Sequence, residues 1–431
     1  MTTAEPLAWK RNTALFVGGQ TISLFGSMIV QYAVMWYVTI ETRSAVAVAL
    51  YAVAAFLPQG VVSIFGGTFA DRVNRKVLIV VADTSTALAT LGLALLMLNG
   101  VTDLWVILVA CAIRSVGAGF QQPTVQAVIP QLVPEDRLLR INGLFQTIQS
   151  GLALLAPAVA GAVFGAFGIV PAFFIDVITA LLGVGVLLLV TVPTLAAVEG
   201  KTTGFREDLV EGWRFIWHHA FIRWLMVLFA VIIVLTGSPS FVTPLLIAQE
   251  WGDEVWRLTV LELAFSVGML VGGVAVSTVL AKRSRIRMIV LASFGFGVFS
   301  LGLGLAPELW VFYALMFLFG SMIPIFSAPF MTLVQEAVPP EKQGRVFSYV
   351  TIVMALSFPL GMVAFGPIAD AGGVRALLVG TGVLALVVTG VAVLVPSGRS
   401  AMRAAGAPPA EAAAQVEAEA GTDAEAEAAR R

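Results

Sequence analysis

Long apolar runs follow one another along most of this chain, and short polar turns separate them. A run of about 20 residues is long enough for an α-helix to cross the hydrocarbon core of a bilayer. Because irregular backbone cannot face lipid, each run is expected to be a helix. The pattern predicts twelve spans, at roughly 13–38, 45–69, 77–98, 103–129, 141–165, 170–193, 221–247, 257–281, 287–306, 309–334, 346–369 and 374–396.

The composition agrees with this pattern. The chain has 431 residues, of which 59% are hydrophobic and 12% are charged, whereas about 25% of a soluble domain is charged. The mean hydropathy is +0.95. The predicted fold class is therefore an all-α polytopic membrane protein embedded in a lipid bilayer. The net charge of −1 gives no indication of nucleic-acid binding, so no nucleic-acid partner is expected.

Lysine and arginine are unevenly distributed between the two sets of turns. If the N terminus is cytoplasmic, the turns on that side carry Arg72, Arg75, Lys76, Arg137, Arg140, Lys282, Arg283, Arg285, Arg287, Lys342 and Arg345. The turns on the other side carry only Arg43, Arg257 and Arg375. By the positive-inside rule, both termini are expected to be cytoplasmic. Lys10 and Arg11 precede the first run without a small-residue cleavage pattern, so this run is expected to be retained as a span.

The two parts of the chain repeat each other at a constant offset. Gly67 and Gly272 are 205 residues apart, as are Gly161 and Gly366, and as are the Val-Pro pairs at 133–134 and 338–339. Such an offset predicts an internal repeat of six helices. We expect an N-terminal six-helix half at 1–193, a cytoplasmic linker at 194–220, a C-terminal half at 221–396 and a tail at 397–431.

The linker and the tail differ in pattern. In the linker, Phe205, Leu209, Trp213 and Ile216 recur at helical spacing, which predicts an amphipathic helix on the inner membrane surface. A solvated connection without a further role is the alternative. The tail is rich in alanine and carries six acidic residues between positions 411 and 427, so it is expected to be disordered.

The turn between the second and third runs carries a dense group of charges. Gly67, Asp71, Arg72, Arg75 and Lys76 resemble the loop signature of the major facilitator superfamily. The family usually has a glycine where this chain has Asn74, and asparagine tolerates a left-handed backbone better than most residues. The resemblance implies a twelve-helix fold of two halves and a latch that holds the outward-open state. The alternative is that the bases only fix topology, which does not explain Asp71.

A narrower resemblance runs along nearly the whole chain. The segments 113–117, 133–135 and 146–150, the glycines of the eighth span and Gly344-Arg345-Val346-Phe347 are similar to the macrolide-efflux permeases and related drug–proton antiporters. The antiporter signature of the fifth helix expects Gly-Pro, whereas this chain has Ala156-Pro157 followed by Gly161. The resemblance implies proton-coupled export. The departure from Gly-Pro leaves the direction of coupling less well defined.

Polar residues follow one stripe on two of the predicted helices. In the first they are Gln20, Ser23, Ser27 and Gln31, and in the fifth they are Asn142, Gln146 and Gln149. Such a stripe faces a partner helix or a watery cavity rather than lipid. We interpret these residues as candidates for the substrate pathway. Hydrogen bonds between helices, each contributing about 0.6 kcal/mol, are the alternative.

Four ionisable residues lie within predicted spans: Asp83, Arg114, Asp176 and Glu262. Each costs about 2.5–3.5 kcal/mol at the centre of a bilayer. Because burial favours the protonated form of a carboxyl group, Asp176 and Glu262 are the candidates for proton coupling. Stabilisation of each carboxylate by a helix N terminus is the alternative. Asp83, close to the basic turn, is expected to form a structural ion pair.

Arg114 lies about ten residues into its span and must be paired or hydrated there. By the resemblance, it assists proton transfer by biasing a nearby acid. A fixed pair that holds two helices together is the alternative.

The sequence does not favour an enzyme. No glycine-rich loop ending in Lys-Ser or Lys-Thr and no His–Glu metal motif is present. Cys111 is the only cysteine, and the adjacent His218 and His219 point to different helix faces, so no metal site is expected. No cofactor is expected either, and a proton gradient is the expected energy source.

The sequence therefore predicts a secondary active transporter that exports amphipathic, macrolide-like compounds in exchange for protons by alternating access. Export of siderophores or lipid-like metabolites and proton-coupled import remain open, as does a membrane sensor that does not transport. The expected protein is a monomer of the bacterial inner cell membrane, whose partners are a small-molecule substrate, protons and the bilayer.

Overall fold

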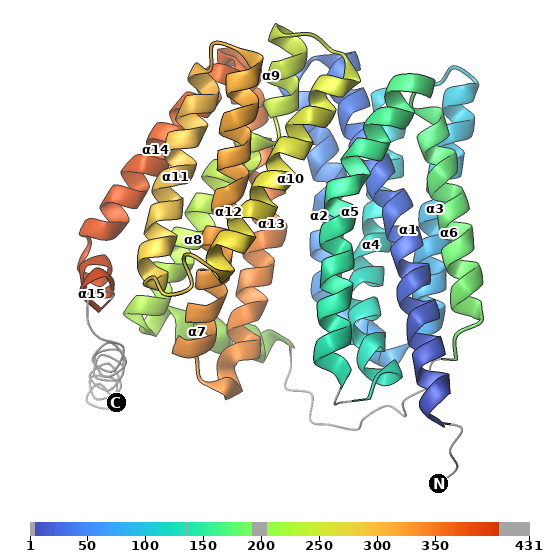
Figure 1. Cartoon of the computed structure of the whole chain (residues 1–431), viewed down its shortest axis with the longest axis horizontal. Helices are drawn as coiled ribbons and strands as arrows, with labels where there is room; N and C mark the ends of the chain where they lie inside the picture. The colour runs from blue at the N-terminus through green and yellow to red at the C-terminus, as the bar shows by residue number, and fades with distance from the viewer. Residues whose placement is uncertain (1–4, 135–136, 192–204, 405–431) are drawn as a thin grey trace. The chain divides into compact units, whose positions relative to one another are not determined.

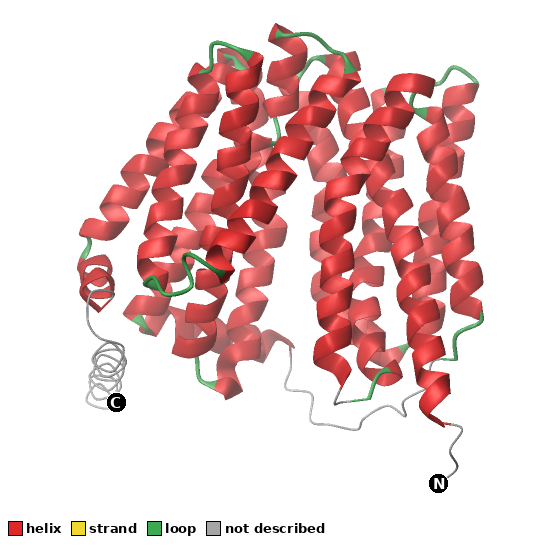
Figure 2. Ribbon diagram, in the orientation of Figure 1, coloured by secondary structure: helices red, strands yellow, loops and turns green. Residues whose placement is uncertain are grey.

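The computed structural model describes residues 5–134, 137–191 and 205–404 of the chain. Within these ranges all regular secondary structure is helical (Figure 2). Twelve of the helices are long and apolar enough to cross a membrane. The predicted fold class and the predicted number of spans are thus confirmed.

The helices follow the predicted runs closely along the chain (Figure 1). The first six are α1 (Glu5–Thr42), α2 (Ala45–Arg72), α3 (Arg75–Leu98), α4 (Leu104–Leu132), α5 (Leu138–Phe167) and α6 (Val170–Leu188). After them come α7 (Phe205–His218), α8 (Ala220–Ser240), α9 (Thr243–Glu250), α10 (Val255–Ser277), α11 (Arg285–Leu305), α12 (Leu309–Ala337), α13 (Pro340–Gly372), α14 (Val374–Leu394) and α15 (Pro396–Ala404).

Two predicted elements differ from the structure. The seventh span, predicted at 221–247, is divided into α8 and the short helix α9. Pro239 and Pro244 flank the division, and proline removes a backbone donor and disfavours helix in the residue before it. The tail predicted to be disordered from residue 397 begins with the helix α15, and residues 405–431 lie outside the described ranges.

The six-helix repeat is visible in the helix bounds themselves. Helix α4 covers 104–132 and α12 covers 309–337, so both ends are displaced by 205 residues, the offset found in the sequence. Both helices are capped by the valine of the repeated Val-Pro pair, Val133 and Val338. Proline after the cap disfavours helical backbone at that valine, which explains why both helices end there.

Contacts between residues divide the chain into two compact units. The first unit contains residues 1–200 together with 244–263 and 362–370, and the second unit contains the remainder. Both short segments that join the first unit come from the ends of later elements, at α9–α10 and at the C-terminal part of α13.

Small residues bring α1 and α6 close together in the first unit. A Cβ atom added to Gly183 would lie 2.9 Å from the backbone oxygen of Gly19, and one added to Gly19 would lie 3.2 Å from Val186. Such contacts require glycine, because membrane helices associate through close packing rather than through the hydrophobic effect.

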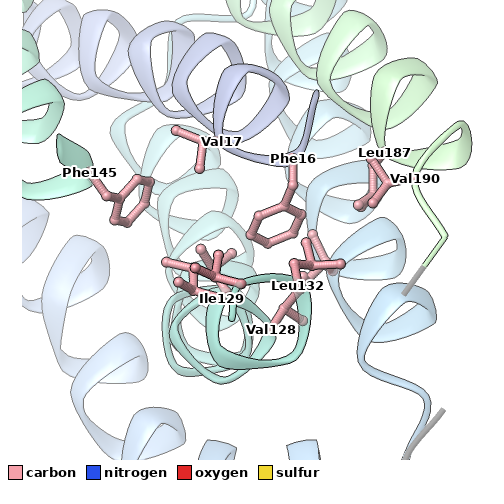
Figure 3. Close-up of a cluster of buried hydrophobic side chains, with 11 residues drawn as sticks. Phe16, Val17, Val128, Ile129, Leu132, Phe145, Leu187 and Val190 are labelled. Atoms are coloured by element: carbon pink, nitrogen blue, oxygen red, sulfur yellow. The ribbon is translucent and has the colours of Figure 1, made fainter. Parts of the chain in front are cut away.

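A hydrophobic cluster closes one end of the first six helices (Figure 3). Phe16 points from α1 towards Val128 and Leu132 of α4. The cluster comes from α1, α3, α4, α5 and α6 and from the residues just after α4 and α6; its members are Phe16, Val17, Ile79, Val125, Val128, Ile129, Leu132, Val133, Phe145, Leu187 and Val190. Burial of these side chains holds the helices together next to the polar residues of the candidate functional site.

At the opposite end of the first unit, Asp370 of α13 caps the N terminus of α2. Its carboxylate accepts hydrogen bonds from the backbone N–H groups of Ala45, at 2.5 Å, and Val46, at 3.1 Å, and from the Ser44 hydroxyl at 2.8 Å. The first N–H groups of a helix have no partner within it, so a carboxylate from another helix takes the place of the usual cap.

The turn between α1 and α2 also binds the turn between α9 and α10. Arg43 has a left-handed backbone with φ 49°. Its guanidinium contacts Asp253 at 2.5 Å, and its carbonyl accepts a hydrogen bond from Gln249 at 3.2 Å. The short segments of the first unit are therefore held by polar contacts at this end.

In the second unit, α7 packs on the start of α13. Glu211 and Arg345 form an ion pair at 2.6 Å, and the rings of Trp213 and Tyr349 lie 6.0 Å apart. A Cβ atom on Gly212 would lie 3.0 Å from the carbonyl of Arg345. A helix is present where the linker was predicted to form one, and it contacts α13; its placement on the inner membrane surface stays a prediction. The side chains of Phe205 and Leu209 lie outside the described part.

Candidate functional site

A buried ion pair between α4 and α6 is the centre of the polar interior of the first unit. Arg114 Nη1 contacts Asp176 Oδ2, and the side chains are 12% and 0% exposed. The carboxylate also accepts hydrogen bonds from Ser27 of α1 at 3.0 Å and from Thr90 of α3 at 2.8 Å. Four helices therefore contribute to one site, and each polar group in it has a partner.

The position of Asp176 follows from the pattern of α6. The buried residues of this helix are Ala172, Phe173, Asp176, Ala180, Gly183 and Leu187, which recur at helical spacing. Asp176 is the one charged residue on this stripe, so folding of the helix places its carboxylate inside the unit. A charge in that position is tolerated when a partner charge and hydrogen bonds compensate it.

Asp83 of α3 forms a second polar site. Its side chain is 4% exposed, and its Oδ1 accepts hydrogen bonds from Ser23 Oγ at 3.1 Å and from Gln121 Nε2 at 2.5 Å. Both partners are neutral. The described contacts of Asp83 therefore do not include the predicted structural ion pair. The residue faces α1 and α4 rather than the basic turn.

A cavity of about 210 Å³ lies among α1 to α5. Its wall contains seven glutamines: Gln20, Gln31, Gln59, Gln121, Gln122, Gln126 and Gln149. Arg114 and Ser27 also line it, so the ion pair borders the cavity. Apolar wall is supplied by residues such as Leu24, Met28 and Val34. The cavity thus offers amide donors and acceptors beside apolar surface.

The predicted pathway residues are divided among several places. Gln20, Ser27, Gln31 and Gln149 line the cavity. Ser23 instead donates to Asp83. Asn142 and Gln146 occupy exposed positions on α5 and are not part of the cavity wall.

The sequence reasoning missed four glutamines of the wall. Gln121, Gln122 and Gln126 lie on α4 at seven, eight and twelve residues beyond Arg114. This spacing places the three glutamines on one face of α4, the same pattern that identified the pathway candidates of α1. The sequence could therefore have indicated them. Gln59 follows Pro58 inside α2, and its backbone N–H donates to Ser115 Oγ at 2.9 Å.

Glu262, the second predicted proton-coupling residue, lies on α10 in the first unit. It is half-buried and close enough to Tyr32 of α1 for the two groups to interact electrostatically. It is not among the residues that line the cavity. The structure therefore brings Arg114 and Asp176 together, and it places Glu262 at a separate location.

The turn that resembles the family loop signature is described in part. The side chains of Gly67, Asp71 and Arg72 lie outside the described part of the structure. Arg75 donates to the carbonyl of Ala127 at 2.8 Å, and Lys76 donates to two carbonyls at the end of α6 at 2.8 Å.

Asn74 has a different role in that turn from the one considered from the sequence. Its φ is −60°, so the backbone is not left-handed. Its side chain caps α3 by accepting hydrogen bonds from the N–H groups of Lys76 and Val77, at 3.0 and 3.3 Å. Asparagine is among the best residues for this position.

Similarity to known proteins agrees with this architecture. The family model of the Major Facilitator Superfamily matches residues 16–362 and 259–417. Macrolide efflux protein A of Streptococcus pyogenes is 28% identical over 381 residues, which cover 88% of this chain and 94% of that protein. The multidrug efflux pump Tap of Mycolicibacterium fortuitum is 24% identical over 368 residues, which cover 81% and 87%.

Solved structures show the same fold. A bacterial homologue of the human lysosomal transporter Spinster aligns with a TM-score of 0.70 and 14% identity, over 93% of this chain and 99% of that one. A D-xylose–proton symporter aligns with a TM-score of 0.64 and 14% identity, over 88% and 96%. Twelve membrane-crossing helices, a six-helix repeat and a family match over most of the sequence lead to one conclusion: the chain belongs to the Major Facilitator Superfamily and is a multi-pass membrane transporter of a small-molecule substrate.

Proposed function

We propose that this protein exports amphipathic, macrolide-like organic compounds in exchange for protons by alternating access. The observation that carries the proposal is a cavity of mixed polarity bordered by the buried Arg114–Asp176 pair. The similarity to macrolide and multidrug efflux proteins supports export and this class of substrate.

The chemistry of the cavity wall suits an uncharged, oxygen-rich ligand with apolar surface. Glutamine amides both donate and accept hydrogen bonds, and apolar side chains between them favour burial of hydrocarbon. Arg114 is the charged residue of this wall, and Asp176 compensates it. A fixed cation or anion in the ligand would therefore find no free countercharge on the cavity side of this pair.

The proton gradient is the proposed energy source, and no cofactor takes part. Asp176 and Glu262 are the proposed coupling carboxyls of the sequence analysis, with Arg114 biasing Asp176. The charged turn at residues 67–76 is the proposed latch between states of similar free energy. The proposed arrangement is a monomer in the inner cell membrane with both termini in the cytoplasm.

Uptake of a labelled macrolide into inside-out membrane vesicles tests the proposal. An imposed pH gradient, acid inside, should drive accumulation in vesicles that contain the protein, and an uncoupler should abolish it. Vesicles without the protein are the background control. The variant Asp103→Asn, which alters an exposed carboxylate at the start of α4, should accumulate the macrolide as the unaltered protein does.

Absence of accumulation would contradict the macrolide assignment. The same vesicles would then be offered siderophores and lipid-like metabolites, and right-side-out vesicles would test import. Accumulation that persists in the presence of the uncoupler would contradict proton coupling while leaving export intact.

A further inference from the structure

Asp83 is a buried acid to which the proposal above gives no role. It lies on α3 in the buried stripe that contains Ile79, Asp83, Ala87 and Thr90. Helix α3 packs against α4 and α6, which supply Arg114 and Asp176. Asp83 and Asp176 are close enough for their charges to repel each other.

The charges that face Asp83 do not balance if both acids are ionised. From α4 the facing group is the neutral Gln121, from α1 the facing groups are the neutral Ser23 and Gln20, and from α6 the facing group is Asp176. The described contacts of Arg114 are with Thr90, Asp176 and the Ser27 carbonyl. The guanidinium therefore compensates Asp176, and the described contacts of Asp83 include no cation.

The two oxygens of Asp83 are in different surroundings. Oδ1 accepts both hydrogen bonds, from Ser23 and from Gln121. Oδ2 is buried and makes no hydrogen bond of normal geometry within the described part of the chain. The Gln20 amide lies close enough to interact with this carboxyl group, but its Nε2 also makes no hydrogen bond of normal geometry. An ionised carboxylate with one bare buried oxygen is costly, because desolvation of that oxygen is not repaid. A carboxylic acid with its proton on Oδ2 removes the charge.

We propose that Asp83 carries a proton on Oδ2 in the resting protein and releases and rebinds a proton during transport. It takes the role proposed above for Asp176, which instead stays ionised against Arg114. The transport part of this inference rests on the proposed proton-coupled function. In the step itself, the O–H bond at Oδ2 breaks, the proton passes to water, and the carboxylate keeps its two hydrogen bonds at Oδ1.

Gln121 connects this site to the ligand cavity. It lines the cavity, and its Nε2 donates to Asp83 Oδ1 at 2.5 Å and to Gln20 Oε1 at 3.3 Å. Donation to Oδ1 favours the ionised form of Asp83. To exchange a proton for the ligand, the bound ligand must strengthen this hydrogen bond, so that Asp83 releases its proton. By linkage, protonation of Asp83 lowers the affinity for the ligand by the same factor.

Infrared difference spectroscopy on the purified protein decides where the proton resides. In Asp83→Asn, which keeps the shape of the side chain, the intensity of the carbonyl band of protonated carboxylic acids should decrease by the contribution of one group. It should be retained in Asp103→Asn, and Asp83→Glu should restore a band at a shifted position. A band unchanged in Asp83→Asn overturns the inference whether or not the protein transports a macrolide.

Transport assays test the second part of the inference. In proteoliposomes without a gradient, Asp83→Asn should still exchange labelled for unlabelled macrolide when the macrolide is saturating, which offsets the weaker binding expected of a permanently neutral side chain. Accumulation driven by a pH gradient should fall to the background. Gradient-driven accumulation that survives in Asp83→Asn overturns the coupling role. If the unaltered protein accumulates no macrolide, the proposed function fails, and the infrared result still decides the protonation of Asp83.

Discussion

At the scale of single residues, the interior of the first unit contains two charged groups, and burial of either one without the other would be unfavourable. Arg114 and Asp176 are nearly removed from water, and each is acceptable because the other is present. Thr90 and Ser27 complete the hydrogen bonds of the carboxylate. The stability of this region should therefore depend on the pair more than on either member.

A double-mutant cycle tests this dependence. Arg114→Gln and Asp176→Asn should each destabilise the protein by about 3–5 kcal/mol, because each leaves one buried charge without its partner. The double variant should lose less than the sum of the two. Unfolding of the detergent-purified protein, followed by heat or by sodium dodecyl sulfate, measures all three values. Additive losses would show that the two charges do not compensate each other.

At the scale of helices, the repeated glycines occupy equivalent contacts. Gly161 of α5 faces Thr259 of α10, whose Cβ would lie 2.9 Å from an added Cβ atom. Gly366 of α13 faces Ala49 of α2 in the same way, at 2.7 Å. Both contacts lie in the first unit, and the two glycines are separated by the repeat offset of 205 residues.

Larger side chains at these glycines should separate the helices. Gly161→Leu and Gly366→Leu should each destabilise the protein by about 1–3 kcal/mol, the usual effect of overpacking. Gly151→Leu on α5 is the matched control, because an added Cβ atom there meets nothing within 4 Å. Thermal unfolding of the purified variants measures the difference. An equal loss in the control would mean that helix packing is not the cause.

The cap that α13 supplies to α2 is a second contact at this scale. Asp370→Ala should lower the free energy of unfolding by about 0.5–2 kcal/mol, since the first N–H groups of α2 lose their acceptor. Asp103→Ala removes a carboxylate at the N-cap of α4 that accepts no capping hydrogen bond, so it should change little. Similar losses in both variants, measured by thermal unfolding, would argue against the cap.

The sequence predicted the bounds of the helices well and the contacts between helices poorly, and both outcomes have physical reasons. Apolar length alone determines that a segment spans a bilayer, so the twelve spans could be identified. The division of the seventh span was missed because Leu245, Leu246 and Ile247 continue its apolar run. The partners of Asp83 were missed because helical spacing shows which residues share a face, and not which helix that face meets.

At the scale of the whole molecule, the proposed alternating access requires the end that contains Ser44 and Asp370 to open. The contacts of Asp370 with α2, and of Arg43 with Asp253, must then be lost in part of the cycle. The exposed Arg43–Asp253 pair contributes about 0–1 kcal/mol, and the cap formed by Asp370 contributes about 0.5–2 kcal/mol. Such contacts can be broken and formed again without a large free-energy difference between states.

A reversible cross-link at this end tests the requirement. In a Cys111→Ser background, Ser44→Cys with Asp370→Cys should be joined by a short, reducible bifunctional thiol reagent. Macrolide transport should stop, and reduction should restore it. Ser44→Cys alone, treated in the same way, is the control. Full transport by the cross-linked protein would mean that this end does not need to open.

The one native thiol is placed where it reports on the cavity. Cys111 is the only cysteine of the chain, it is buried, and it lines the cavity. Cys111 is therefore the one cysteine at which a small maleimide could react, slowly because the thiol is buried, and the reagent must first enter the space that a ligand would fill. A compound that occupies the cavity should slow this labelling in proportion to its occupancy. The chain thus contains its own chemical probe, with which ligands can be ranked before any transport assay is available.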